Sequence, residues 1–292
     1  MKVAIFGVGG QLGRAVAATL ATTHDVVSID HDRADVRHAV AVADVVRAAQ
    51  PEWVLNCAAM THVDRCENDP LAAFEVNALG ARNVARAAAA AGARLLHVST
   101  DYVFDGEKPS PYGEDDAVRP INAYGVSKLS GEWFVRADCP AHAIVRTSGL
   151  YGWYVCRGKG ANFAETILAR ARQGQPLRVV SDERLTPTFT EDLAAQLRAI
   201  IEGNVPSGVY HATNAGACSW FDFASELVRL AGVPASIQPI SAREWKSPTR
   251  RPANSVLENR ALAKLGLDRM PDWRDALARY LAARDDKAGP AA

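Results

Sequence analysis

Residues 3–13, VAIFGVGGQLG, decide the fold of this 292-residue chain. The four apolar residues at the start predict a short buried strand, and residues 14–21 predict the helix that follows it. Between them, Gly7, Gly10 and Gly13 have the GxxGxxG spacing of a turn that binds a dinucleotide. In such a turn Gly7 permits the tight bend, Gly10 lets a diphosphate approach the backbone, and Gly13 lets helix and strand pack closely. The N–H groups at the start of the helix would then face the phosphates.

Strands and helices alternate through the first half of the chain. Strands are expected at residues 25–30, 53–56, 94–98 and 143–146, with helices at 40–50, 71–91 and around Tyr124. This alternation predicts an α/β fold, a Rossmann-type doubly wound parallel sheet covered on both faces. The predicted NAD(P)-binding domain is 1–147.

The regular alternation fades after Arg146. Helices are expected at 162–173, 192–202, 220–231 and 272–284, and strands at 177–180 and 208–211. We expect residues 148–292 to form mostly a smaller, discontinuous C-terminal substrate-binding lid, with returns to the first domain near 177–210. Residues 151–160, rich in glycine and aromatic side chains, predict a substrate-facing loop. The small and charged tail, 285–292, is expected to fray.

Composition narrows the possible partners. The 33 basic and 33 acidic side chains balance, which argues against a nucleic-acid partner or an anionic membrane. No apolar run reaches the roughly 18–20 residues that span a bilayer, and the N-terminus lacks the features of a signal peptide. The five cysteines are scattered without zinc-ligand spacing, which is typical of a reduced, cytoplasmic protein with no metal site.

Asp30 ends the second predicted strand, 20 residues after Gly10. At that distance a carboxylate meets the adenosine ribose hydroxyls, which favours NAD because it would repel a 2′-phosphate. Arg33 and Arg37 follow closely and could accept such a phosphate instead. The sequence therefore predicts NADPH or NADH and leaves the choice open.

Tyr124 and Lys128 are four residues apart in a predicted helix, so their side chains would share one face. A lysine charge beside a phenol lowers the phenol pKa from about 10, toward the range of a general acid or base. The alternative is a surface helix with an unrelated Tyr and Lys. Thr100 and Asp101, at the end of the fourth strand, could equally be an ordinary strand-end hydroxyl and a turn residue.

These motifs together resemble the extended short-chain dehydrogenase/reductase family. The matches, in order, are GxxGxxG at Gly7, Asp30, NCAA at Asn56, STDYVFDG at Ser99 and YGxSK at Tyr124. The chain is most similar to the dTDP-4-dehydrorhamnose reductase branch of that family. The marks of the branch are FGxxGQLG at Phe6, AAxTxVDxxExxP from Ala58 to Pro70, RTS at Arg146, GxNF at Gly160, TPT at Thr186 and RRPANSxL at Arg250.

The resemblance implies a set of site residues. The catalytic trio would be Thr100, Tyr124 and Lys128. Cofactor contacts would be Gly7, Gly10, Gln11, Leu12, Gly13, Asp30, Asp35, Val36, Ala58, Ala59, Met60, Thr61, Tyr124 and Lys128. Substrate contacts would be Thr100, Asp101, Tyr124, Asn162 and Arg251. The implied reaction is NAD(P)H-dependent reduction of the C4 ketone of a dTDP-4-keto-6-deoxy sugar, in a monomer or homodimer.

Two positions depart from the family pattern. Gly149 stands where the family has an aromatic residue after RTS, and Trp153 or Tyr154 of the same loop could substitute for it. Ala15 stands where some members have a glutamate that binds Mg²⁺ at a dimer contact, so no metal is expected.

Two other functions stay open. A sugar-nucleotide epimerase shares the Tyr and Lys, whereas a dehydratase would carry Asp-Glu after the Thr, and this chain has Asp101-Tyr102. A non-catalytic, NADP-binding regulatory subunit also resembles the branch, and the intact trio argues against it.

Overall fold

The computed structural model describes residues 1–154 and 160–284. Its centre is a six-stranded, all-parallel sheet in the order β10-β5-β4-β3-β1-β2. The strands are β1 (Lys2–Phe6), β2 (Asp25–Ile29), β3 (Trp53–Asn56), β4 (Arg94–Thr100), β5 (His142–Thr147) and β10 (Gly208–His211). Their apolar runs are almost continuous because helices cover both faces, and the predicted doubly wound α/β fold is confirmed.

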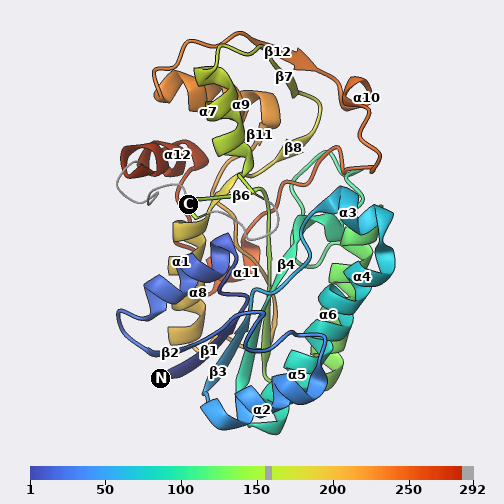
Figure 1. The fold of residues 1–292 in the computed structure, drawn as a ribbon, viewed down its shortest axis with the longest axis vertical. Helices are drawn as coiled ribbons and strands as arrows, with labels where there is room; N and C mark the ends of the chain where they lie inside the picture. The colour runs from blue at the N-terminus through green and yellow to red at the C-terminus, as the bar shows by residue number, and fades with distance from the viewer. Residues whose placement is uncertain (155–159, 285–292) are drawn as a thin grey trace.

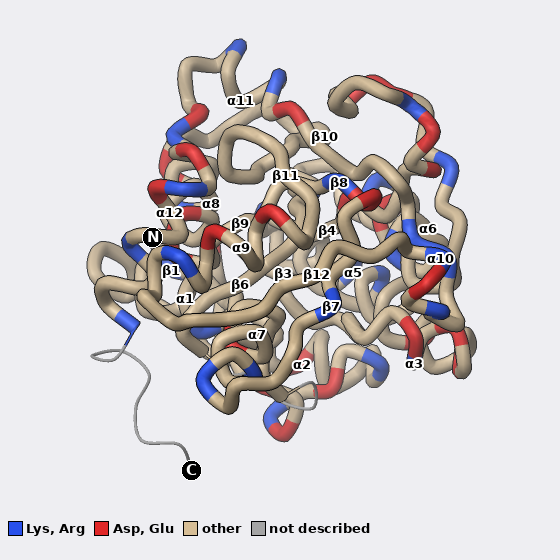
Figure 2. The backbone as a smooth tube through the Cα atoms, turned by 90° about the horizontal axis from the view of Figure 1, so that it is seen from above, with Lys and Arg blue, Asp and Glu red and all other residues tan. Residues whose placement is uncertain are grey.

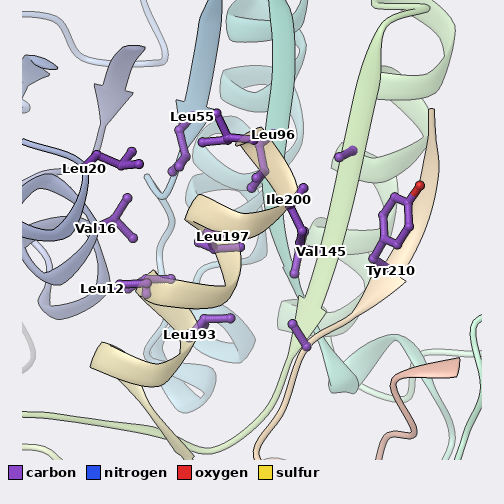
Figure 3. Close-up of a cluster of buried hydrophobic side chains, with 14 of the residues drawn as sticks. Leu12, Val16, Leu20, Leu55, Leu96, Val145, Leu193, Leu197, Ile200 and Tyr210 are labelled. Atoms are coloured by element: carbon purple, nitrogen blue, oxygen red, sulfur yellow. The ribbon is translucent and has the colours of Figure 1, made fainter. Parts of the chain in front are cut away.

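Two helical layers enclose the sheet (Figure 1). One face carries α1 (Gln11–Leu20) and α8 (Thr190–Glu202), which pack on each other and on the strands. The other face carries α2 (Ala39–Ala49), α5 (Gly80–Ala90) and α6 (Ala123–Asp138). Figure 3 shows the first interface, where helix side chains meet those of the strands: Leu12, Val16, Leu20, Leu193, Leu197 and Ile200 against Leu55, Leu96 and Val145.

The strand order reverses at β1, which has β2 on one side and β3 on the other. Ligands of open parallel sheets bind in the crevice at the carboxyl ends of strands beside such a reversal. That point lies between the glycine turn after Phe6 and the run of small residues after Asn56.

The helix predicted at 71–91 has an interruption that the sequence did not predict. It consists of α4 (Pro70–Phe74), a π-helical turn, η1 (Glu75–Leu79), and α5. The wider turn lets the Asn77 side chain leave the helix and bond both backbone groups of Met60 and the hydroxyl of Ser127. Single π turns of this kind recur at functional sites.

A smaller half of the molecule, formed by the elements named next, lies beyond the carboxyl edge of the sheet (Figure 1). Three two-stranded pairs form there: β7 (Leu177–Val180) with β12 (Ile237–Ile240), β8 (Arg184–Leu185) with β11 (Cys218–Ser219), and β6 (Leu150–Tyr151) with β9 (Thr188–Phe189). Helices α7 (Phe163–Arg172), α9 (Trp220–Leu230) and α12 (Trp273–Ala282) share one aromatic core with them. The return to the large sheet therefore consists of α8 and β10, and residues 177–180 pair within the smaller half.

The short helices complete the description: α3 (Val63–Asn68), the 3₁₀ turn η2 (Asp101–Val103), α10 (Ala242–Trp245) and α11 (Arg260–Lys264). Residues 155–159 of the predicted substrate-facing loop and the predicted frayed tail lie outside the described residues. Basic and acidic residues are interspersed along the backbone in Figure 2. No helix in 1–154 or 160–284 is long and apolar enough to cross a bilayer.

Candidate active site

The glycine turn after β1 is shaped by close backbone contacts. Gly7 has φ +81°, and a Cβ there would lie 2.6 Å from the backbone nitrogen of Ala58. A Cβ on Gly13 would lie 2.2 Å from the Gly7 carbonyl oxygen, so α1 packs directly on the turn. At Gly10 the nearest atom to a Cβ is the same oxygen at 3.4 Å, and Gly10 lines a cavity at the carboxyl edge of the sheet. The turn therefore has room for a ligand at Gly10.

The start of α1 suits an anionic ligand. Gly10 is the N-cap residue, no side chain caps the helix, and its first turn has no acidic residue. The free N–H groups and the positive end of the helix dipole thus favour a diphosphate. The Gln11 side chain is turned aside, since its amide donates to the Leu150 carbonyl at 3.2 Å.

The carboxylates after β2 are held by local bonds. Asp30 accepts the Arg33 N–H at 2.9 Å. Asp35 accepts the backbone N–H and the guanidinium of Arg37, and these bonds lower the pKa of Asp35 to about 2. Val36 is buried, and its side chain lies 2.7 Å from where a Cβ on Gly80 would be. Arg33 therefore lies beside the carboxylate predicted to meet the ribose, whereas the Arg37 guanidinium is paired with Asp35.

A cavity of about 290 Å³ joins the glycine turn to the ends of β3, β4 and β5 and to the smaller half. Of the predicted residues, Gly10, Gln11, Leu12, Gly13, Ala59, Thr61, Thr100, Asp101, Tyr124, Lys128 and Asn162 line it. The others, Gly7, Asp30, Asp35, Val36, Ala58, Met60 and Arg251, do not.

Helix α6 carries Tyr124 and Lys128 into this cavity. The Asn122 side chain caps the helix by accepting the Gly125 N–H at 2.8 Å. A Cβ on Gly125 would lie 2.2 Å from the Tyr102 carbonyl oxygen, so the first turn of α6 sits directly on the chain after β4. Tyr124 and Lys128 therefore share the cavity with Thr100, at the end of β4.

The pKa of Tyr124 is not shifted in the direction that the sequence predicted. Burial raises the pKa of Tyr124 above its usual value, and a side-chain hydrogen bond with Thr100 only partly opposes this. The Lys128 ammonium donates to the Val98 carbonyl at 2.7 Å, and burial lowers its pKa to about 8. The net shift of the Tyr124 pKa is therefore opposite to the predicted one, because desolvation dominates.

The predicted substrate contacts are engaged within the protein. Asp101 accepts hydrogen bonds from Thr100 at 2.9 Å and Ser148 at 2.8 Å, while burial raises its pKa. Asn162 caps α7 and donates to the Gly152 carbonyl at 2.8 Å. Arg251 binds Asp64 of α3 at 3.0 Å. In the described structure Asp101 holds Thr100 in place rather than presenting a free carboxylate.

Gly149 lines the cavity with φ +54°, and a Cβ there would lie 2.7 Å from Leu185 Cδ1. A larger side chain would therefore strain both backbone and neighbour. Trp153 and Tyr154 do not line the cavity, and the Trp153 indole donates to the Tyr280 carbonyl at 3.0 Å. Among the described residues of the smaller half, two aromatic residues line the cavity, Phe163 and Trp220.

Several lining or supporting residues were not predicted. Cys57, Ser148 and Ser255 lie inside the quoted NCAA, RTS and RRPANSxL runs, so a sequence signal was present. Glu183 and Trp220 reach the cavity from two separate segments. Nothing in the local sequence of these two residues marks them. No group of three or more His, Cys, Asp and Glu in residues 1–154 and 160–284 could hold a metal ion.

Comparison with known proteins agrees with this geometry. The sequence model of the family described as RmlD substrate binding domain matches residues 1–285. The spore coat polysaccharide biosynthesis protein SpsK of Bacillus subtilis is 38% identical, over 97% of this chain and 98% of its own. The dTDP-4-dehydrorhamnose reductase of Mycolicibacterium smegmatis is also 38% identical, over 97% and 85%.

Solved structures give the same result. A dTDP-4-dehydrorhamnose reductase from Clostridium acetobutylicum superposes with a TM-score of 0.92 at 39% identity, covering 98% of this chain and 100% of that one. The enzyme of that name from Bacillus anthracis, in complex with NADP, gives 0.92 at 36% identity, over 96% and 98%. The resemblance predicted from the sequence is confirmed: the chain belongs to the RmlD substrate binding domain family, within the extended short-chain dehydrogenases/reductases.

Proposed function

We propose that this protein reduces the C4 ketone of a dTDP-4-keto-6-deoxy sugar with NAD(P)H, converting dTDP-4-dehydro-L-rhamnose to dTDP-L-rhamnose. The observation that carries the proposal is one cavity, lined both by the open glycine turn and by Thr100, Tyr124 and Lys128. A dinucleotide bound at the turn and a second ligand would therefore meet beside a buried phenol. The relatives named dTDP-4-dehydrorhamnose reductase, which match nearly the whole chain, support the same activity.

The residues divide the work by their environments. Bound nicotinamide would supply the hydride for the carbonyl carbon. Tyr124 keeps its proton at neutral pH because its pKa is raised, so it can donate that proton to the oxygen as negative charge develops. Lys128, with a pKa of about 8, is mostly charged at pH 7 and stabilises that oxygen electrostatically. Thr100 is fixed between the Tyr102 N–H and the Asp101 carboxylate, beside the phenol.

The two halves of the chain would share the ligands. In this proposal residues 1–147, with the later return, hold the dinucleotide at the predicted contacts, and the pieces of 148–292 form the lid over the sugar nucleotide. Glu183, Arg184 and Trp220 line the cavity from that side. Asp30 and the nearby arginines would decide between NADH and NADPH. The choice between monomer and homodimer stays a prediction.

Cofactor oxidation tests the proposal most directly. Purified protein would be mixed with NADPH or NADH and a panel of 4-keto-6-deoxy sugar nucleotides, and loss of the reduced cofactor would be followed by absorbance. We expect turnover with dTDP-4-dehydro-L-rhamnose. Loss of the Tyr124 proton in Tyr124→Phe should lower kcat by about 10²–10⁴-fold and leave cofactor affinity nearly unchanged. Full activity in that variant would contradict the role of Tyr124.

A second candidate substrate is a related dTDP sugar with a ketone at the same carbon. A Streptomyces antibioticus relative, 38% identical over 95% of this chain, is named a probable dTDP-4,6-dihydroxy-2-methyloxan-3-one 4-ketoreductase. The panel distinguishes the two by kcat/KM. Cofactor that copurifies and is not consumed would favour an epimerase. Tight NADPH binding without turnover of any sugar would favour a regulatory subunit.

A further inference from the structure

One buried charge cluster beneath the cavity is not accounted for by the proposed chemistry. Glu132 lies on α6 one turn after Lys128 and is 1% exposed. Its carboxylate accepts three hydrogen bonds from the sheet: Ser99 Oγ at 2.6 Å, Arg146 Nε at 2.9 Å and Arg146 Nη2 at 2.7 Å. Arg146 and Ser99 are 2% and 3% exposed. A buried ion pair of this kind recovers little net stability, because both charges lose their hydration.

The members of this cluster lie next to residues that line the cavity. Ser99 precedes Thr100 on β4, and Arg146 precedes Thr147 and Ser148, which line the cavity at the end of β5. On the helix side, the Lys128 ammonium bonds the Val98 carbonyl, one residue before Ser99. Two adjacent residues of β4 are therefore tied to two successive turns of α6, at Lys128 and at Glu132.

We infer that Glu132 is a positioning residue that acts through Lys128. With Ser99 and Arg146 it fixes α6 on the sheet, and its carboxylate is the negative charge that keeps the Lys128 ammonium protonated in the cavity wall. The inference rests on the proposed function, since it assigns Lys128 a charged role in the reduction.

The other groups around Lys128 cannot replace that charge. From its own helix it meets the neutral phenol of Tyr124. Burial raises the pKa of the Cys57 thiol, at the end of β3, to about 12, so that thiol carries no charge at neutral pH. The buried imidazole of His97, on β4, has its pKa held well below 6.5 by burial and by Lys128 itself, so it is neutral too. Glu132 is thus the anion that opposes the effect of burial on Lys128.

Arg146 balances Glu132 on the side of the sheet. Its guanidinium lies 5.3 Å from the centre of the Phe104 ring, and its third nitrogen, Nη1, has no hydrogen-bond partner in residues 1–154 and 160–284. Glu132 is on the same helix as Lys128, one turn away, and it raises the pKa of Lys128 against the effect of burial, whereas Arg146 reaches Glu132 from β5. Removing both members of the pair should therefore remove a charge that Lys128 feels while leaving no buried ion unpaired.

A direct titration of Lys128 tests the inference without substrate or cofactor. The protein would be labelled with ¹³C at the ε-carbons of its seven lysines. The Lys128 signal would be assigned from its loss in Lys128→Arg, and its midpoint followed by NMR. In Glu132→Gln we expect a midpoint lower by about one pH unit, as expected for removal of a nearby charge in a partly screened site. An unchanged midpoint would overturn the inference.

Asp138→Asn is the matched control on the same helix. Asp138 accepts bonds from Arg82 at 2.9 Å and Arg86 at 3.1 Å, so it is also a carboxylate held by arginine. It lies ten residues from Lys128, about 15 Å along the helix. We expect the Lys128 midpoint in this variant to equal that of the unchanged protein. A shift as large as in Glu132→Gln would show that any loss of charge on α6 has the same effect.

The double variant Glu132→Gln/Arg146→Met separates charge from folding. It buries no unpaired ion, so it should unfold at a higher temperature than Glu132→Gln. We expect it to retain the lowered Lys128 midpoint, with the alkaline limb of kcat/KM for NADPH-dependent reduction shifted the same way. Recovery of the original midpoint together with Tm would show a purely structural pair and overturn the inference. If the proposed function itself fails, turnover is absent in every variant while the titration stays readable.

Discussion

The two halves of the molecule both have apolar cores, but they differ in the polar and aromatic side chains that they bury. In and beneath the cavity wall, the sheet half buries polar side chains at 0–3% exposure and connects them by hydrogen bonds: Asn56, Asn77, His97, Ser99, Lys128, Glu132 and Arg146. The smaller half instead buries an aromatic cluster of Tyr151, Phe189, Phe223, Trp273 and Tyr280. Its ion pairs, such as Arg284–Glu165, lie nearer the surface. We expect the buried charges to cost the sheet half stability in return for a fixed geometry, and the aromatic cluster to stabilise the smaller half.

The largest expected effect comes from a substitution in the aromatic cluster of the smaller half. Phe223 is 1% exposed and packs 5.1 Å from the Tyr151 ring and 5.9 Å from the Trp273 ring. Phe223→Ala should lower the free energy of unfolding by about 3–5 kcal/mol through the cavity it leaves. Urea unfolding measures the loss, and NADPH titration below the transition should give an almost unchanged Kd. Trp133→Ala, at a 57% exposed aromatic residue on α6, is the control and should cost little. Equal losses in both variants would contradict the contrast between the halves.

Substitutions in the glycine turn should instead affect the sheet half and its binding of NADPH. A Cβ in Gly13→Ala would lie 2.2 Å from the Gly7 carbonyl oxygen, so turn and helix must separate. We expect a loss of about 1–3 kcal/mol in unfolding free energy, together with weaker NADPH binding. Gly10→Ala meets its nearest atom at 3.4 Å and should unfold like the unchanged protein, yet bind NADPH more weakly because the methyl group enters the cavity. Unaltered NADPH affinity in Gly10→Ala would place the diphosphate elsewhere.

The sequence predicted the parts of the site that local patterns encode. The strand before Gly7, the spacing to Asp30 and the Tyr124–Lys128 pair each lie within a few turns or one βαβ unit. Parallel strands bring their carboxyl ends to one edge, and so Thr100 was predicted to lie near that pair.

Long-range packing decides the rest. The three bonds to Glu132 come from residues 33 and 14 positions away, and only the register of α6 on β4 and β5 brings them together. The π turn at Asn77 depends on the loop at Met60 and on Ser127 of α6, neither of which the local pattern of the helix reports. The depth at which Tyr124 is buried, which reversed its predicted pKa shift, is likewise a property of the assembled halves.

The smallest expected effect is a gain in the free energy of unfolding. It tests whether the buried charge of Lys128 destabilises the sheet half. Burial lowers the pKa of Lys128 to about 8 in the folded state, against about 10.4 in the unfolded chain. Below pH 8 both states bind the proton and the folded protein carries the full cost of a buried ammonium. Between pH 8 and about 10.4 the unfolded chain binds more protons, so stability rises with pH. Lys128→Met should therefore be more stable at pH 7.

The gain should be about 1–2 kcal/mol, since the variant also leaves the Val98 carbonyl without the Lys128 bond and that loss offsets part of the relief. Urea unfolding at pH 7 and at pH 9.5 measures the gap, which should narrow at the higher pH. The exposed Lys264→Met is the control and should show no such pH dependence. If Lys128→Met were less stable than the unchanged chain at pH 7, the hydrogen bond from Lys128 of α6 to Val98 of β4 would outweigh the cost of burying the charge. The polar cluster would then stabilise the sheet half rather than weaken it.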